Sequence, residues 1–406
     1  MRRGLRRILA YWRAERRTLT QGFVALLIAT VGSLAAGVVL GKITGTLERL
    51  PGLMVLIPAA IATRGNIFGA LGSRLGTSIH AGLFEPNRNR EGVLYQNVYS
   101  ATVLTFVVSF LVALLAKTLS EAFGVTTISL LDFIVIALVG GILSSILVAT
   151  FAVFLSVGAH RRGWDLDSVA APLITSAGDM FTIPALFLAS FAVGVRWVTE
   201  TVAVVLVLGT VVITVAGLIT NLSLARRVIR ESLPILVVAG TIDILAGLVA
   251  QARLGEFIAL PALLMLIPPI LGNAGGLGGI LSARLASKLH LGVITAKGRP
   301  EALAVLDFSI VLLIAVAVFP VLGLAADVAA AVLHLASPGP AKMMGITLLA
   351  GMMATLIAAV IAYYTAVATF RVGLDPDNHG IPMITSSMDF FGILSIVFAL
   401  VVLGIS

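Results

Sequence analysis

Apolar runs of about 20 residues, nearly free of charge, recur from Thr20 to the end of this chain. A helix of that length crosses a hydrocarbon core roughly 30 Å thick. Because the backbone polar groups in that core must be satisfied within the segment, the runs predict α-helices. Charged residues make up 11% of the chain, against about 25% in soluble domains. The sequence therefore predicts an all-α polytopic membrane protein.

Two blocks of sequence recur at an offset of 210 residues. Residues 51–82 and 261–292 are identical at 12 of 32 positions, and residues 163–181 and 373–391 at 9 of 19. The matches include Pro, Gly, Arg, His and Asp, which the apolar bias of a membrane chain does not explain. Internal duplication of this kind is the building plan of many transporters.

Each copy is expected to hold five spanning helices, and one further helix at 197–222 gives about 11 spans. Because five is odd, the extra helix restores a parallel orientation of the copies, with a pseudo-two-fold axis along the membrane normal. The predicted organisation is a basic cytoplasmic or interfacial segment at 1–19, a first five-helix repeat at 20–196, a linking helix and basic loop at 197–230, and a second repeat at 231–406.

The distribution of Lys and Arg predicts the orientation in the membrane. With a cytoplasmic N-terminus, 20 of these residues fall in cytoplasmic segments and 6 in outer segments. The positive-inside rule therefore predicts an integral plasma-membrane protein with an external C-terminus. These loops also explain the net charge of +8, so we do not expect nucleic acid as a partner. The basic N-terminal segment fits an interfacial helix better than a cleaved signal peptide.

Asp179 and Asp389 lie at equivalent positions inside predicted membrane helices. A carboxylate at mid-bilayer costs about 2.5–3.5 kcal/mol on insertion scales, and such residues are rare. One alternative is a structural Asp that is hydrogen-bonded to neighbouring helices. Two carboxylates facing one axis, however, repel each other unless a cation lies between them. We therefore predict that this pair holds a divalent ion on a central path.

The residues around both Asp supply oxygen ligands. Each Asp is preceded, three and four residues earlier, by a Ser and a Thr on the same helical face. These residues are Thr175, Ser176, Thr385 and Ser386. Since the chain has no Cys, and no His or Met pair at soft-ligand spacing, Mg²⁺, Ca²⁺ or Mn²⁺ is favoured over Zn²⁺ or Cu. Mg²⁺ keeps several waters, which suits two carboxylates and a few hydroxyls.

Further polar residues are candidates for the pathway or for a second cation site. Four acidic residues precede the two Asp-bearing helices, where they either cap the helices or form a vestibule. Two glycine-rich stretches, 63–69 and 272–279, each contain an Asn and either permit close helix packing or expose backbone carbonyls. These polar candidates are Asp165, Asp167, Asp375, Asp377, Asn66 and Asn273.

Three charged residues within the spans have no counterpart in the other copy. Arg64 either repels cations or pairs with a carboxylate. Asp243 and Asp307 align with Ser33 and Asn97, and either carry a coupling proton or Na⁺ or cap a polar contact.

The segments LIPPILGNAGGLGG (266–279) and DPDNHGIPMITSSMD (375–389) resemble the MgtE-type divalent-cation transporters. The duplicated layout is similar to solute carrier family 41. The resemblance implies a single-chain pseudo-dimer with its pore between the halves, as in the homodimers of bacterial members. It also implies Mg²⁺ ligation by Asp179 and Asp389, with Thr175 and Thr385 nearby. The large cytoplasmic sensing domains of the bacterial members have no counterpart in this sequence, so their gating is not carried over.

The predicted function is transport of Mg²⁺, or another hard divalent cation, by a non-enzymatic protein in contact with lipid and without an organic cofactor. One alternative is an exchanger coupled to Na⁺ or H⁺. An intramembrane aspartyl protease also needs two membrane Asp, but Ser176 stands where its GxGD motif has the first Gly. An organic-solute carrier would need a more aromatic pocket than 7% aromatic residues provide.

Overall fold

The computed structural model describes residues 10–80, 82–85, 89–162, 170–373 and 376–405 of the chain. All regular structure among these residues is helical. Eleven helices within the described residues are long and apolar enough to cross a membrane, as judged by length and composition. This confirms the predicted all-α membrane protein with 11 spans.

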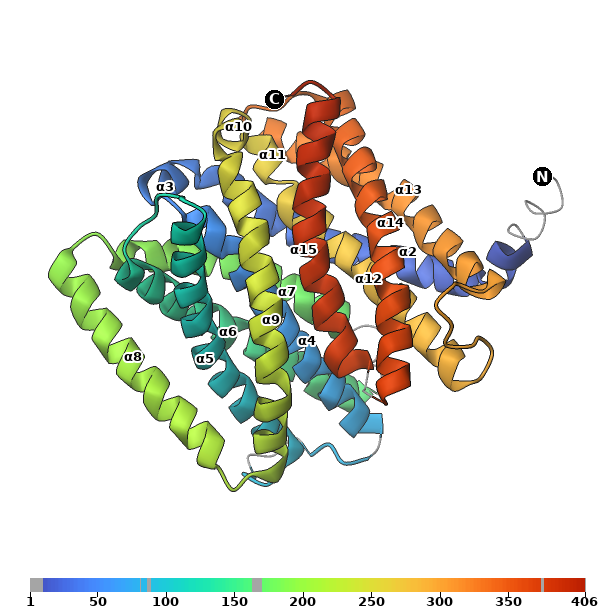
Figure 1. The fold of residues 1–406 in the computed structure, drawn as a ribbon, viewed down its shortest axis with the longest axis horizontal. Helices are drawn as coiled ribbons and strands as arrows, with labels where there is room; N and C mark the ends of the chain where they lie inside the picture. The colour runs from blue at the N-terminus through green and yellow to red at the C-terminus, as the bar shows by residue number, and fades with distance from the viewer. Residues whose placement is uncertain (1–9, 81, 86–88, 163–169, 374–375, 406) are drawn as a thin grey trace. The chain divides into compact units, whose positions relative to one another are not determined.

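The helices follow one another with short connections (Figure 1). The long ones are α2 (Arg16–Lys42), α4 (Leu53–His80), α5 (Val93–Ala122), α6 (Leu130–Arg162), α7 (Ala170–Ala189), α8 (Arg196–Ile219), α9 (Ser223–Ala252), α12 (Ile267–His290), α13 (Ala302–Val332), α14 (Pro340–Val372) and α15 (Pro376–Val402). The short ones are α3 (Thr44–Arg49), η1 (Ser190–Ala192), α10 (Leu254–Ala259) and α11 (Pro261–Leu264). Residues 10–14 are also helical.

Helices α4 and α12 end in the same way. Two residues beyond their last helical residue lie Gly82 and Gly292, whose φ angles are +69° and +67°. A Cβ atom disfavours this left-handed backbone, which glycine adopts without strain. Both copies therefore have glycine at this turn, which accounts for one of the sequence matches at offset 210.

The chain forms two compact units. The middle unit comprises Val39–Gly255 and contains α4 to α9. The terminal unit comprises Met1–Val38 together with Glu256–Ser406 and contains most of α2 with α12 to α15. The boundaries of the predicted repeats, at 20–196 and 231–406, stay a prediction. The repeats are defined by similarity in sequence, whereas the compact units are defined by contacts and divide the chain at other residues.

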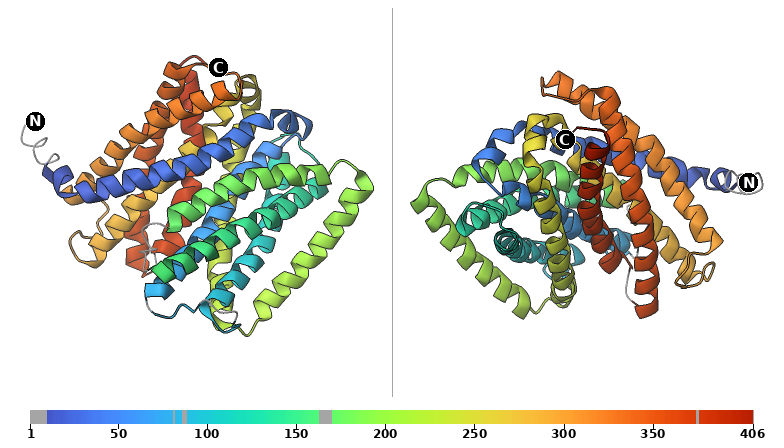
Figure 2. Two further views of the ribbon diagram at one scale, coloured as in Figure 1. Left: turned by 180° about the vertical axis from the view of Figure 1, so that it is seen from behind. Right: turned by 45° about the horizontal axis from the view of Figure 1, so that its top comes forward.

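The units differ from the repeats because each unit takes its first spanning helix from the other copy. In the middle unit, α9 packs against α4 and α5 (Figure 1). In the terminal unit, α2 runs beside α12 and α13 (Figure 2), and Gly22 of α2 faces Ile280 and Ile314. The first helix of each copy thus completes the helix bundle of the other.

Two glycines show that this exchange follows the duplication. A Cβ atom on Gly37 of α2 would collide with the carbonyl oxygen of Met265. A Cβ atom on Gly247 of α9 would collide with the carbonyl oxygen of Val55. Because both members of one contact lie 210 residues from those of the other, the two crossed contacts are equivalent. Both let a helix approach a neighbouring backbone closely, as small residues do in membranes.

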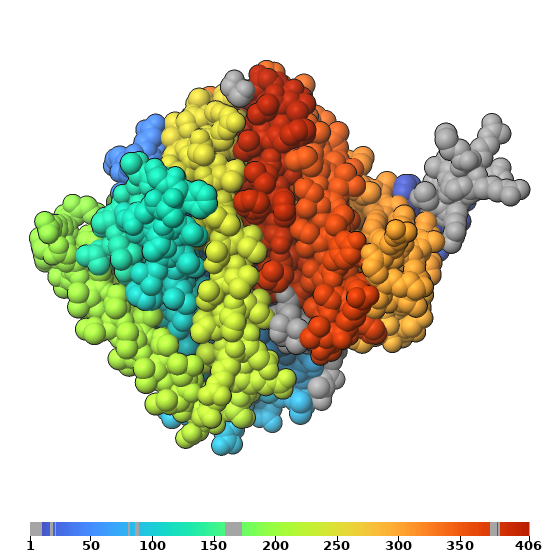
Figure 3. Space-filling model, viewed as in Figure 1, coloured from blue at the N-terminus to red at the C-terminus, as the bar shows by residue number. Residues whose placement is uncertain are grey.

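The linking helix α8 has no counterpart in the repeat, and it packs on α5, α6 and α9 of the middle unit. Most of its apolar side chains are exposed, including Trp197, Val212 and Ile219, which is the surface expected of a helix in contact with lipid. In the terminal unit, α14 and α15 lie side by side along one face (Figure 3).

Candidate cation site

Asp179 lies on α7 directly after Gly178, where α7 is in close contact with α4. A Cβ atom on Gly178 would lie 3.3 Å from the backbone nitrogen of Gly65. One turn earlier, Thr175 lies over α4, so that a Cβ on Gly65 would be 3.2 Å from its methyl and a Cβ on Gly69 would be 3.3 Å from its hydroxyl oxygen. Asp179 is 5% exposed. The glycines of α4 thus make room for the oxygen-bearing face of α7.

The same arrangement recurs on α15 in the terminal unit. A Cβ on Gly275 of α12 would lie 3.5 Å from the methyl of Thr385. The hydroxyl of Thr385 donates a hydrogen bond of 3.1 Å to the carbonyl oxygen of Pro382. Asp389 follows one turn later and is half-buried. Because Gly65 and Gly275 are equivalent, as are Thr175 and Thr385, the contact between the Asp-bearing helix and its neighbour belongs to the duplicated design.

Each unit therefore presents one membrane carboxylate with hydroxyl groups on the preceding turn. Ser176 and Ser386 are both buried within their own units. Among the residues that the structure describes, no three His, Asp or Glu side chains come together as a metal-binding group. A single carboxylate with hydroxyls and carbonyls is a sparse, hard donor set, of the kind that leaves a cation partly hydrated. Whether Asp179 and Asp389 share one ion stays a prediction.

The two candidate Asn residues have different surroundings. Asn273 is buried on α12, where its amide nitrogen donates to the hydroxyl of Thr30 at 2.9 Å and to the carbonyl of Pro269 at 2.8 Å. The side chain thus joins α12 to the exchanged helix α2. Asn66 is buried on α4 beside Gly65, close to the contact with α7. A role for either residue in the pathway stays a prediction.

The acidic vestibule that the sequence suggests stays a prediction too. Asp165, Asp167 and Asp375 lie outside the described residues. Asp377 lies in the first turn of α15, where the structure describes the backbone alone.

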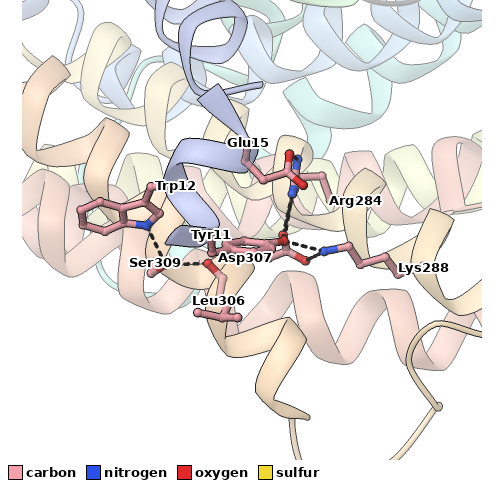
Figure 4. A network of polar contacts seen from close by, with 8 residues as sticks. All are labelled: Tyr11, Trp12, Glu15, Arg284, Lys288, Leu306, Asp307 and Ser309. Atoms are coloured by element: carbon pink, nitrogen blue, oxygen red, sulfur yellow. Dashed lines mark hydrogen bonds and ion pairs between the residues drawn. The ribbon is translucent and has the colours of Figure 1, made fainter. Parts of the chain in front are cut away.

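Asp307 is the centre of a polar cluster that joins the N-terminal segment to α12 and α13 (Figure 4). Its side chain is fully buried and accepts hydrogen bonds from Arg284 at 2.7 and 3.0 Å, from Lys288 at 2.5 Å and from Tyr11 at 2.8 Å. Glu15 lies 3.2 Å from Arg284. With two cations on one carboxylate, Asp307 caps a polar contact and is not placed to bind a coupling cation. We call Tyr11, Glu15, Arg284, Lys288 and Asp307 the N-terminal cluster.

The middle unit holds a simpler version of this contact. Arg74 donates a hydrogen bond of 2.6 Å to the side-chain oxygen of Asn97. Both Arg74 and Arg284 lie 23 residues before their partners, and the two pairs are equivalent at offset 210. The matched Arg and the alignment of Asn97 with Asp307 are visible in the sequence, but nothing in their spacing marks them as partners.

Two further ionisable residues within the spanning helices, Asp243 and Arg64, are also buried. Asp243 on α9 is 1% exposed within the middle unit. Arg64 on α4 is 1% exposed, and its guanidinium donates hydrogen bonds to Ser109 of α5 and Ser145 of α6. The sequence left the partner of Arg64 open, because serine hydroxyls inside apolar helices carry no pattern that marks them as partners.

The fold and the site define a class: a duplicated helical membrane protein in which both copies carry an intramembrane carboxylate at an equivalent position. Residues 57–189 and 267–399 both match the model of the MgtE family, described as a divalent cation transporter. The two matches begin and end 210 residues apart and together cover more than half of the chain. The chain belongs to the MgtE family of divalent cation transporters. The predicted resemblance is confirmed, as is the prediction of a non-enzymatic transporter.

The relatives include members of solute carrier family 41. Solute carrier family 41 member 3 of Rattus norvegicus is 24% identical over 407 residues, which cover 92% of this chain and 85% of the relative. The mouse member 3 is also 24% identical, with 92% of this chain and 80% of the relative covered. Member 2 of Gallus gallus is 25% identical over 295 residues, which cover 70% of this chain but only 50% of the relative. No solved structure matches the chain.

Proposed function

We propose that this chain carries Mg²⁺ across the plasma membrane through a central pathway between its two repeats, as a single-chain pseudo-dimer. Asp179 and Asp389 bind the ion, with the hydroxyls or carbonyls of Thr175 and Thr385 as neighbouring ligands. The observation that carries this proposal is the repeated contact in which an Asp follows, one turn later, a Thr that packs on a glycine of the adjacent helix. Two divergent copies with the same costly carboxylate point to a shared ionic role.

The chemistry of Mg²⁺ suits this donor set. The ion gives up its water reluctantly and is usually held by one or two carboxylates while several waters remain. A mostly hydrated ion needs a path lined by small residues and oxygen atoms, which the Gly, Thr and Ser of α4, α7, α12 and α15 provide. A membrane potential that is negative inside the cell would favour entry of a divalent cation by about 4.6 kcal/mol per 100 mV.

The test is Mg²⁺ uptake by purified protein in proteoliposomes. We expect Asp179→Asn and Asp389→Asn each to reduce uptake to the level of protein-free vesicles, because each variant removes half of the negative charge that offsets ion desolvation. Asp132→Asn is the matched control, since Asp132 lies near the start of α6, away from the candidate site, and its carboxylate accepts hydrogen bonds from Ser129. Wild-type uptake by both membrane variants would refute the assignment.

Coupling to H⁺ or Na⁺ is the second candidate, and the buried carboxylate of Asp243 in α9 favours it. The equivalent position holds Ser33, so a coupling group would be present in one copy only. Coupled exchange predicts that Asp243→Asn removes the dependence of Mg²⁺ uptake on a Na⁺ or pH gradient. Uptake that does not respond to either gradient in the wild type would exclude this candidate.

A further inference from the structure

Arg64 is a buried cation within a spanning helix. It lies on α4, is 1% exposed, and belongs to the span Leu53–Ile79. Its Nη1 donates a hydrogen bond of 3.0 Å to Ser145, and its Nη2 donates another to Ser109. Thr105 extends this group of hydroxyls by a hydrogen bond of 3.0 Å to Ser145. These partners solvate the guanidinium without neutralising it, and arginine stays protonated in proteins, so its positive charge persists inside the middle unit.

The second copy fills the same space without a charge. The positions equivalent to Arg64, Ser109 and Ser145 are Ala274, Phe319 and Thr355. In the middle unit, a Cβ on Gly141 would lie 2.6 Å from the hydroxyl oxygen of Ser109 and 3.0 Å from Nη2 of Arg64. In the terminal unit, a Cβ on the equivalent Gly351 would collide with the ring of Phe319. Packing at this position therefore does not require arginine, and the charge needs another explanation.

The charge lies on the helix that supports Asp179. A Cβ on Gly178 would be 3.6 Å from the carbonyl carbon of Arg64, so α7 touches the backbone of α4 at this residue. The guanidinium extends from this contact toward α5 and α6. Because its surroundings are less polar than water, its charge still acts on a doubly charged cation bound on α7 of the same unit. The second copy has no such charge beside Asp389, because Ala274 occupies the equivalent position.

We propose that Arg64 tunes the affinity of the candidate cation site: its fixed positive charge weakens the binding of divalent cations at Asp179 and so permits their release. This inference rests on the proposed function of Asp179 and Asp389. Conduction requires binding that is strong enough for entry and weak enough for exit. Two carboxylates alone would hold a doubly charged ion tightly, and a cation beside one of them reduces the net negative charge from two to one. Asp179 then binds the cation more weakly than Asp389 does, so the ion is released more readily from Asp179.

The experiment measures KM and Vmax for Mg²⁺ uptake in proteoliposomes. Arg64→Lys keeps the charge, Arg64→Gln removes it, and Arg64→Ala with Ser109→Phe removes it while copying the packing of the second copy. We expect wild-type kinetics for the Lys variant. Both uncharged variants should lower KM by about ten-fold and also lower Vmax, because loss of the electrostatic repulsion strengthens binding and slows release together. A merely structural role would lower Vmax without lowering KM, and the Lys variant would be impaired too.

Two controls separate the possible failures. Size-exclusion elution and thermal unfolding identify folded variants, and if Arg64→Gln fails to fold, the double variant with its native-like packing provides the test. An unchanged or raised KM in a folded uncharged variant would overturn the inference on Arg64. Wild-type uptake by Asp179→Asn would instead overturn the proposed site itself. If Asp179→Asn abolishes uptake while the Arg64 variants keep the wild-type KM, only the inference on Arg64 fails.

Discussion

Replacing Asp307 by Asn would convert the N-terminal cluster into the simpler contact seen between Arg74 and Asn97. Asp307 is fully buried, while the side chains of Arg284 and Lys288 are only 15% and 19% exposed. The replacement keeps the size of the side chain and one acceptor oxygen. It removes the negative charge that lies 2.7 Å from Arg284 and 2.5 Å from Lys288. Two poorly solvated cations would then lie close together with less compensation.

The expected cost follows from these contacts. Removing one partner of a buried ion pair costs about 3–5 kcal/mol. Because Arg284 keeps Glu15 at 3.2 Å and Asn can still accept a hydrogen bond, we expect the lower end, about 3 kcal/mol. In a folding unit of about 190 residues, each 1 kcal/mol shifts Tm by about 2–4 °C. The Tm of the purified protein should therefore fall by about 6–12 °C.

The assay is thermal unfolding in detergent, followed by tryptophan fluorescence. Trp12 donates a hydrogen bond of 2.9 Å to Ser309 on α13, so its emission, measured in a background with Trp164→Phe and Trp197→Phe, reports release of the N-terminal segment. Asn97→Asp is the matched control: it adds a carboxylate beside Arg74, and we expect a change in Tm of less than about 3 °C. A Tm for Asp307→Asn close to that of the wild type, or an equal loss in the control, would show that the buried carboxylate does not stabilise the N-terminal cluster.

Three further predictions follow from other contacts. Burial raises the pKa of Tyr11 above its ordinary value of 10.0, and its hydrogen bond to Asp307 raises it further, although the hydrogen bond from Lys288 lowers it. The protonated hydroxyl of Tyr11 therefore contributes fully to stability below pH 10, and this contribution is lost as the pH rises through the raised pKa. We expect Trp12 emission to be constant from pH 6 to 8 and to change above pH 10, with a smaller change in Tyr11→Phe. Gly37→Ala and Gly247→Ala should each lower the free energy of unfolding by about 1–3 kcal/mol, because both introduce a Cβ against a backbone carbonyl. The readout is a lowered Tm, and a loss in only one variant would contradict the equivalence of the crossed contacts. Mg²⁺ at 100 times its Kd should stabilise the wild type by about 2.7 kcal/mol, and Asp179→Asn should lose this effect.

Much of the fold was predictable because the bilayer restricts the choices. The apolar runs predicted the eleven spans, and the match at offset 210 predicted a duplication, with which the two MgtE regions agree. The exchange of α2 and α9 was not predictable from the same match. Similarity between repeats shows which helices are equivalent, but not which copy a helix packs against, because that depends on contacts such as Gly37 with Met265.

The candidate site was predictable to a similar degree. Spacing alone placed Thr175 and Thr385 one turn before their Asp residues. The structure adds that these threonines pack against the equivalent glycines Gly65 and Gly275 of the adjacent helices. The contacts of Arg64 were not predictable, because its partners are serines on helices that lie far away in the sequence. The N-terminal cluster was missed for a related reason: its basic residues on α12 were assigned to membrane orientation, whereas two of them bind a buried carboxylate.

In the proposed mechanism, Asp179 and Asp389 bind the same ion. Mn²⁺ replaces Mg²⁺ at oxygen sites and can be located by its anomalous scattering in crystals of the purified protein. We expect one Mn²⁺ peak between the two carboxylates, bound to both directly or through retained water, and no such peak in Asp179→Asn. Separate peaks at each Asp, or carboxylates turned toward lipid with no ion beside them, would contradict it.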